Sequence, residues 1–287
     1  MLVLTAVGAL GGLALILATG LVVANRTLYV EEDPRFDAVE TMLPGSNCGA
    51  CGFPGCRALA EALVQGDALP GKCTVASEDD RAAIASYLGV DVGAEEKQVA
   101  RLACAGGSNV AHTHASYAGL DSCRAAALVS GGGKSCVWGC LGQGDCGEVC
   151  DFNAITMNRQ HLPVVEADLC TACGDCVDIC PRDLFSLQPV SHRLWVACNN
   201  PEAGDAAEAD CRVLCNGCGR CVADAPEGLI RLQDKLAVID YSRNSLASRI
   251  AIERCPTGSI VWLEDGGTAQ KGKAAIRIVR KEALPVG

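Results

Sequence analysis

The strongest constraint on the fold is a run of four cysteines followed by proline, C-x2-C-x2-C-x3-C-P, from Cys170 to Pro181. In this spacing a short loop presents three thiolates to three irons of one [4Fe-4S] cluster, and the fourth cysteine binds the other cluster of a pair. The run therefore predicts a unit with two clusters, in which segments distant in the sequence are joined through shared ligand sets.

A looser run precedes it, with gaps of three, five and three residues and with Asp151 at the position where proline is expected. Because the fourth cysteine of each run binds the cluster of the other run, the two runs together complete two sites. The expected ligand sets are Cys136, Cys140, Cys146 and Cys180 for one cluster, and Cys150, Cys170, Cys173 and Cys176 for the other.

The same register recurs nearer the carboxyl end of the chain. Of the two ligand sets expected from this register, one has all four cysteines. The other set has none, because its four positions hold Ala225, Ser245, Ser248 and Ala251. We therefore expect a second ferredoxin-like unit that keeps one cluster. Its ligands are Cys215, Cys218, Cys221 and Cys255. In place of the missing cluster we expect a short helix, with Leu246, Ile250 and Ile252 filling the space.

A fourth set near the amino end has the spacing C-x2-C-x4-C-x16-C and consists of Cys48, Cys51, Cys56 and Cys73. Four thiolates also suit tetrahedral zinc, but a [4Fe-4S] cluster is favoured beside three others. The chain has 20 cysteines, and these sets leave Cys104, Cys123, Cys198 and Cys211 unassigned. A fifth cluster is possible for them, but the long gaps between them favour unligated, buried thiols.

Tight cysteine runs argue against a disulfide framework, which is typical of short secreted chains. Cluster assembly needs reduced thiols, so we expect the cysteine-rich part to lie in the cytoplasm.

The segment from Leu2 to Ala24 carries no charged residue, and as a helix of about 34 Å it would cross a bilayer once. A cleaved signal peptide is disfavoured because no basic residue precedes the apolar run. The amino terminus is then expected outside.

These patterns predict an α+β chain in six parts. They are a transmembrane helix at 1–26, a small helical four-cysteine [4Fe-4S] module at 33–90, a connector at 91–133, a two-cluster ferredoxin-like unit at 134–190, a second ferredoxin-like unit with one cluster at 191–264, and a basic tail at 265–287. The tail could touch lipid headgroups or an acidic partner, but a solvated tail is favoured.

Several function classes are excluded. A formal net charge of -10 argues against nucleic acid as a partner. The Gly131–Ser135 segment resembles a phosphate loop but has Leu128 where that motif needs glycine, and no G-x-G-x-x-G follows a strand. No nucleophile-and-base pattern is visible, so we expect no catalytic residue, and no bound cofactor other than four [4Fe-4S] clusters.

The segment Leu43–Cys56, LPGSNCGACGFPGC, follows a single apolar helix and precedes the ferredoxin runs. This combination resembles the B subunit of the Rnf electron-transport complex, called Rsx in some bacteria. The resemblance implies a bacterial inner-membrane translocase that couples electron transfer between ferredoxin and NAD to movement of Na+ or H+. This chain would be its iron-sulfur subunit and the entry port for electrons, and would have no self-contained active site. The implied partners are other membrane and cytoplasmic subunits, soluble ferredoxin or flavodoxin, and the lipid bilayer.

Two other functions remain open at this point. A reductase that keeps a redox-sensing regulator reduced, without pumping ions, would use the same chain. A structural scaffold of iron and zinc is the other alternative, and a reducible visible absorption band would exclude it.

Overall fold

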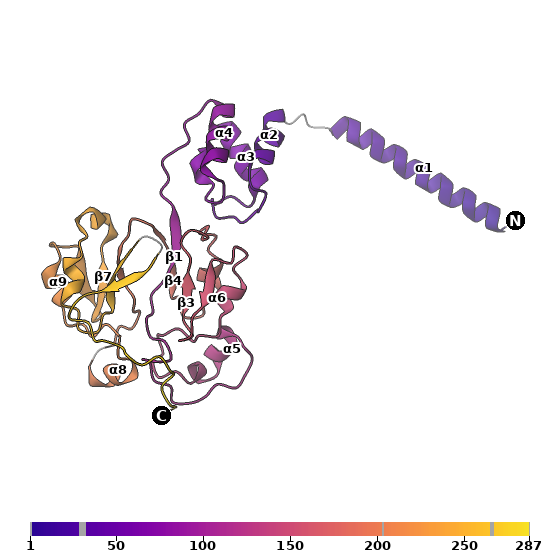
Figure 1. Cartoon of the computed structure of the whole chain (residues 1–287). Helices are drawn as coiled ribbons and strands as arrows, with labels where there is room; N and C mark the ends of the chain where they lie inside the picture. Colours follow the sequence, from indigo (N-terminus) through magenta and orange to yellow (C-terminus); the bar gives the residue numbers. More distant parts are fainter. Residues whose placement is uncertain (1, 29–32, 203, 265–266, 287) are drawn as a thin grey trace.

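The computed structural model describes residues 2–28, 33–202, 204–264 and 267–286. Helix α1 (Leu2–Leu28) projects away from the rest of the chain (Figure 1). Its window Leu10–Thr27 has a mean hydropathy of 1.5, and none of that window is buried against other parts of the protein. By length and composition, α1 is the one helix in the described part of the chain that could cross a membrane.

A small helical module follows α1. Its elements are α2 (Pro34–Met42), α3 (Cys56–Gln65), the 3-10 turn η1 (Pro70–Lys72) and α4 (Glu78–Leu88). Helix α4 begins with a capping box, in which the side chains of Ser77 and Asp80 each accept the other's backbone N–H. Leu59, Leu63 and Ile84 are almost fully buried between the helices. The module therefore has a core of its own.

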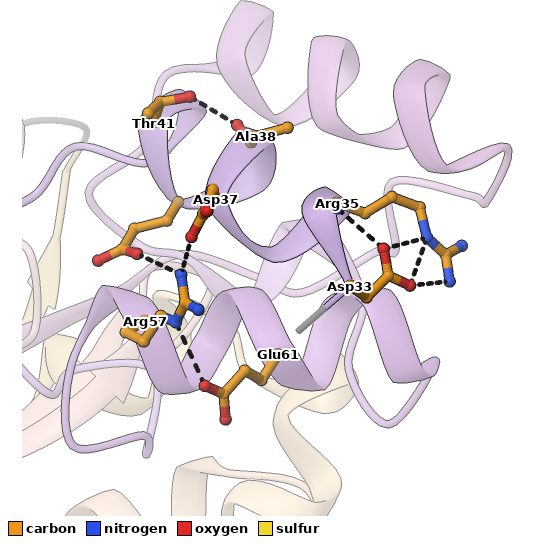
Figure 2. Close-up of polar contacts among 8 residues, drawn as sticks. Asp33, Arg35, Asp37, Ala38, Thr41, Arg57 and Glu61 are labelled. Atoms are coloured by element: carbon orange, nitrogen blue, oxygen red, sulfur yellow. Dashed lines mark hydrogen bonds and ion pairs between the residues drawn. The ribbon is translucent and has the colours of Figure 1, made fainter. Parts of the chain in front are cut away.

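Arg57 joins two helices of this module, as Figure 2 shows. From α3 its guanidinium contacts Asp37 on α2, and it donates to Glu40 Oε2 at 3.0 Å. Its Nε lies 3.3 Å from Glu61 Oε1, one turn further along α3. These pairs are largely exposed, so they orient α2 against α3 more than they stabilise the module.

The first cysteine-rich unit contains four strands and several short helices. They are β1 (Gln98–Leu102), α5 (Cys123–Leu128), η2 (Ser130–Gly133), α6 (Asp145–Glu148), β2 (Ile155–Met157), β3 (Pro163–Val165), α7 (Asp175–Ile179) and β4 (Phe185–Pro189). Strands β2 and β3 form a hairpin, and β1 pairs antiparallel with β4 from Gln98↔Pro189 to Leu102↔Phe185. Strand β1 thus packs into this unit from the segment expected to be a connector, because Val99 and Ala100 are buried beside Phe185.

The second unit repeats this arrangement. Its elements are β5 (Leu194–Val196), α8 (Asp205–Asp210), α9 (Arg220–Asp224), β6 (Ile230–Gln233), β7 (Leu236–Ile239), η3 (Tyr241–Leu246), α10 (Ile250–Glu253), β8 (Ile260–Leu263) and β9 (Ala269–Lys271). Strands β6 and β7 form the hairpin, and β5 pairs with β8 as β1 pairs with β4. Strand β9 adds to β8 from the segment expected to be tail. Figure 1 shows the second unit beside the first.

The residues that fill the space of the missing cluster in the second unit differ in part from the expectation. Ala251 and Ile252 are buried in the core of the second unit, and Ala225 packs against that core. Leu246 and Ile250 were also expected to fill the space, but they are 47% and 64% exposed. Ile250 is exposed because α10 is a single turn, so residue 250 faces away from the side that buries 251 and 252. Leu246 lies instead on η3, which buries none of its residues. Helix α10 also has the register of α7 in the first unit, so it replaces a helix rather than a loop.

The carboxyl-terminal segment lies against the first unit and its connector. The Leu284 N–H donates to Ser108 O at 2.8 Å, and Asn109 Nδ2 donates to Arg280 O at 2.9 Å. Gln160 Nε2 donates to Lys281 O at 3.2 Å. This part of the tail is therefore held to the chain through its backbone, whereas a solvated tail was expected. Residues 265, 266 and 287 of the expected tail lie outside the described residues.

Candidate metal centres

All 20 cysteines fall within the described part of the chain, and all are free thiols. Among the described residues, no three His, Cys, Asp or Glu side chains are close enough together to hold a single metal ion. Zinc would need all four sulfurs at about 2.3 Å from one ion. A [4Fe-4S] cluster instead binds each thiolate to a different iron and so spaces the thiolates around a wider core. The cysteine groups described next are candidates for such a core.

The site predicted from the run that ends in Pro181 has the most regular spacing. It is called the reference site below, and the other groups are compared with it. Cys150, Cys170, Cys173 and Cys176 line one cavity with about 320 Å³ of space between atoms. The Ala100 N–H points at Cys170 Sγ, 3.4 Å away. Burial raises the pKa of Cys176 to about 12, and charge on Cys170 and Cys173 adds to this shift. Metal binding at such buried thiols requires release of their protons. The four residues expected together are together.

A second cavity contains about 340 Å³ and is lined by Cys123, Cys140, Cys146 and Cys180. Cys180 ends α7 but lies with Cys146 of α6, which is the crossing expected from the sequence. The fourth member differs from the expected set, because Cys123 lies where Cys136 was expected. Asp145 explains this placement, since its carboxylate accepts the Cys123 N–H at 2.7 Å and the Ser122 hydroxyl at 3.0 Å. Helix α5 is thereby tied to α6.

Cys136 instead lines a third cavity, of about 310 Å³, with three cysteines that were expected to be unligated: Cys104, Cys198 and Cys211. Burial raises the pKa of Cys198 to about 12 and that of Cys211 to about 11. Sequence reasoning missed this group because its members are far apart in the chain and follow no known spacing. One signal was available: the run that begins at Cys136 departs from the ferredoxin spacing, as expected of cysteines that serve different sites.

The fourth group lies in the core of the second unit, which buries Cys215, Cys221 and Cys255. Burial raises the pKa of Cys221 to about 12, and charge on Cys215, Cys255 and Cys218 adds to it. Desolvation also acts on Cys255, but hydrogen bonds from the Ile260 N–H and the Ser259 hydroxyl outweigh it and lower the pKa of that thiol. Cys218 is exposed at the surface. The core therefore brings together three residues of the expected set, and Cys218 lies near enough for its charge to act on Cys221.

The fifth group belongs to the helical module. Cys56 begins α3, and its N–H donates to Asn47 Oδ1 at 2.8 Å. Gly55 permits this turn, because a Cβ there would lie 2.9 Å from the same oxygen. Burial raises the pKa of Cys73, and charge on Cys51 and Cys56 adds to the shift. Cys48 follows Asn47 on the same loop.

The module lies next to the first unit. The hydroxyl of Thr74 donates to Thr171 O at 2.6 Å. Thr74 directly follows Cys73 of the module, and Thr171 directly follows Cys170 of the reference site. The candidate sites of the two parts are therefore joined by a short path through the protein.

Comparisons with known proteins match two stretches of the chain that contain candidate cysteines. A family model described as "Putative Fe-S cluster" matches residues 43–75, and one described as "4Fe-4S binding domain" matches residues 163–185. The chain is 39% identical to the B subunit of the Na(+)-translocating ferredoxin:NAD(+) oxidoreductase complex of Acetobacterium woodii, over 96% of this chain and 81% of the relative.

Two further relatives are similar over nearly their whole length. The B subunit of the proton-translocating ferredoxin:NAD(+) oxidoreductase complex of Clostridium ljungdahlii is 36% identical over 94% of each chain. The B subunit of the ion-translocating oxidoreductase complex of Methanosarcina acetivorans is 34% identical over 90% of this chain and 97% of the relative.

Proposed function

Because the chain belongs to the family of B subunits of ion-translocating ferredoxin:NAD(+) oxidoreductase complexes, we propose that it is the electron-relay subunit of such a complex. In this function it passes electrons between ferredoxin and the subunits that act on NAD, while the whole complex translocates Na+ or H+. The observation that carries the proposal is the reference cavity, in which Cys150 of one run completes the set of Cys170, Cys173 and Cys176.

Four [4Fe-4S] clusters follow from the sequence-predicted sites. One is held by the helical module, two by the first unit and one by the second unit, and both units are then ferredoxin-like. We replace one expected ligand, so that Cys123 completes the set of Cys140, Cys146 and Cys180. The clusters supply one-electron carriers. The chain supplies thiolates, spacing and an apolar envelope, and has no active site of its own within the translocase.

The partners follow from the same arrangement. Helix α1 spans the bacterial inner membrane once and anchors the chain to the other membrane subunits. The cluster sites lie in the cytoplasm, where thiols stay reduced. Soluble ferredoxin or flavodoxin exchanges electrons there, and the exposed Cys218 makes the site of the second unit accessible from the surface. Lipid bilayer and partner subunits, rather than nucleic acid, are the surroundings of this chain.

The test is reduction of the full-length chain, purified in detergent without oxygen, by reduced ferredoxin. We expect a broad visible absorption that bleaches on reduction and returns on oxidation, because iron-sulfur clusters change charge in one-electron steps. Cys176→Ala is the matched variant, and should remove the part of the bleaching that comes from the reference site. A purified chain that holds zinc and shows no bleaching would refute the relay function.

A further inference from the structure

Two strand ends meet where the first and second units touch. Strand β1 of the first unit runs into Cys104, and strand β5 of the second unit runs into Cys198. The Ala105 N–H donates to Ala197 O at 3.0 Å, directly beside both cysteines, and Trp195 Nε1 donates to Leu102 O at 2.9 Å. The contact between the units therefore brings together two thiols from equivalent positions in the repeat.

The other two thiols of this cavity come from elements packed on the same contact. Cys211 directly follows α8 and pairs with Ala111 of the connector in an isolated antiparallel β-bridge. The Arg212 N–H beside it donates to Val110 O at 3.0 Å. Cys136 enters from the looser run, because the Ser135 N–H donates to His112 O at 3.0 Å. Four separate segments thus deliver one cysteine each to a single cavity.

This cavity matches the reference site in size and chemistry. It contains about 310 Å³, against about 320 Å³ for the cavity of the proline-terminated run. Both cavities are lined by four cysteines and otherwise mainly by small or apolar residues. Cys136 and Cys211 are buried, and Cys104 and Cys198 are partly buried. Four sulfurs from separate segments that line one shared space are arranged as the ligands of one cluster would be.

Polar groups point at the sulfurs as they do in the reference site. Buried Asn200, 2% exposed, directs its side-chain Nδ2 at Cys136 Sγ at 3.8 Å. Gly106 allows a close approach, since a Cβ there would lie 3.0 Å from Cys211 Sγ. N–H groups aimed at sulfur stabilise thiolates and tune the potential of a cluster.

The cavity also contacts both of its neighbours through ligand residues. The Cys140 N–H lies 3.4 Å from Cys104 Sγ, and Cys140 itself lines the second cavity. The Cys215 N–H lies 3.3 Å from Cys198 Sγ, and Cys215 belongs to the site of the second unit. A redox centre here would lie between the two units. On each side, a ligand of this centre contacts the backbone N–H of a ligand of the neighbouring centre.

We infer that Cys104, Cys136, Cys198 and Cys211 bind a fifth [4Fe-4S] cluster, which links the clusters of the two ferredoxin-like units. The inference rests on the proposed relay function. With this fifth set, each of the chain's 20 cysteines is a ligand of one cluster. Electrons then have a continuous route from the helical module through the first unit to the second.

The test is a count of iron and acid-labile sulfide in the full-length chain, assembled anaerobically. We expect about twenty iron atoms per chain, whereas four clusters would give about sixteen. Cys198→Ala and Cys211→Ala should each lower the count by about four, and so should Cys173→Ala, which serves as a control at the reference site.

Double variants separate one site from two. Cys198→Ala with Cys211→Ala should lose no more iron than either alone, because both residues serve one cluster. Cys198→Ala with Cys173→Ala should lose twice as much. Reduction of the second unit by electrons from the first should also slow in Cys198→Ala, as measured by rapid-freeze electron paramagnetic resonance.

The outcomes are distinguishable. A wild-type count near sixteen, the four-cluster value, with reversible bleaching would overturn the fifth site but leave the relay function standing. Additive losses in the Cys198 and Cys211 pair would likewise overturn it, and neither result requires a variant of the reference site to fold. A chain without iron would overturn the proposed function itself.

Discussion

Among single residues, Lys134 has an unusual position between two candidate centres. Its Nζ donates to Gly106 O and to Cys140 O, each at 2.6 Å. Gly106 lines the cavity of Cys104, Cys136, Cys198 and Cys211, whereas Cys140 lines the neighbouring one. The ammonium therefore lies beside both, in a part-buried position where charges are weakly screened.

We expect Lys134→Met to lower the reduction potentials of these two centres. A reduced cluster carries one more negative charge than an oxidised one, so a nearby cation favours reduction. The shift should be on the order of tens of millivolts for a partly buried charge at this range. Redox titration followed by electron paramagnetic resonance measures it. Lys134→Arg keeps the charge and should restore most of the potential, and equal potentials in Lys134→Met and the wild type would contradict this role.

At the scale of elements, a short helix carries the third cysteine of each ferredoxin run. Helices α6, α7 and α9 each start after a left-handed glycine, namely Gly144 at φ 97°, Gly174 at φ 99° and Gly219 at φ 70°. Only glycine adopts this backbone without strain. Helix α10 is the counterpart in the vacated set, and it follows Arg249 in an ordinary right-handed conformation. The special turn has disappeared together with the cysteines.

The end of α7 supports a prediction about the crossing of ligands. Cys180 follows α7, which carries Cys176, but it lines the cavity of Cys146 on α6. Cys180→Ser should therefore damage the cluster of Cys123, Cys140 and Cys146, and leave the reference cluster with all its thiolates. Mössbauer or electron paramagnetic resonance spectra of the variant distinguish the two sites. Selective loss of the reference cluster would show that the crossing is assigned wrongly.

In the whole molecule, the long apolar helix α1 is separate from the parts that hold the cysteines. Figure 1 shows α1 directed away from the helical module, and none of its apolar window is buried by the rest of the chain. The three cysteine-bearing parts instead contact one another, through Thr74 and Thr171 at one junction and Ala105 and Ala197 at the other. We therefore expect the stability of the cysteine-rich parts not to depend on α1.

This separation predicts the result of a truncation. A chain that begins at Asp33 should be soluble without detergent and should keep the iron content of the full chain, since no core residue is removed. It should fail to join membranes that contain the other subunits. Ultracentrifugation and iron analysis test both statements. Loss of a third or more of the iron on truncation would show that α1 supports the fold of the cysteine-rich part.

The sequence by itself determined the classes of element and the iron-sulfur family to which the chain belongs. Local spacing is sufficient where one loop supplies three ligands, as with Cys170, Cys173 and Cys176, because the geometry of such a loop depends on neighbouring residues only. A long uncharged segment likewise needs no tertiary information to be identified as a helix that can cross a membrane. The register of the repeat predicted that Cys255 would join the core of the second unit, as it does.

Only the tertiary structure decided how the remaining cysteines are grouped. Cys123 lies beside Cys146 because Asp145 ties α5 to α6, and no spacing encodes that contact. Cys104 and Cys198 meet because two strand ends pair where the units touch. The tertiary structure also decided which side chains occupy the space of the missing cluster, since the single turn of α10 directs Ile250 outward and Ile252 inward. Contacts between distant segments depend on how whole units pack, and a linear pattern carries that information only where a repeat or a motif has already fixed the geometry.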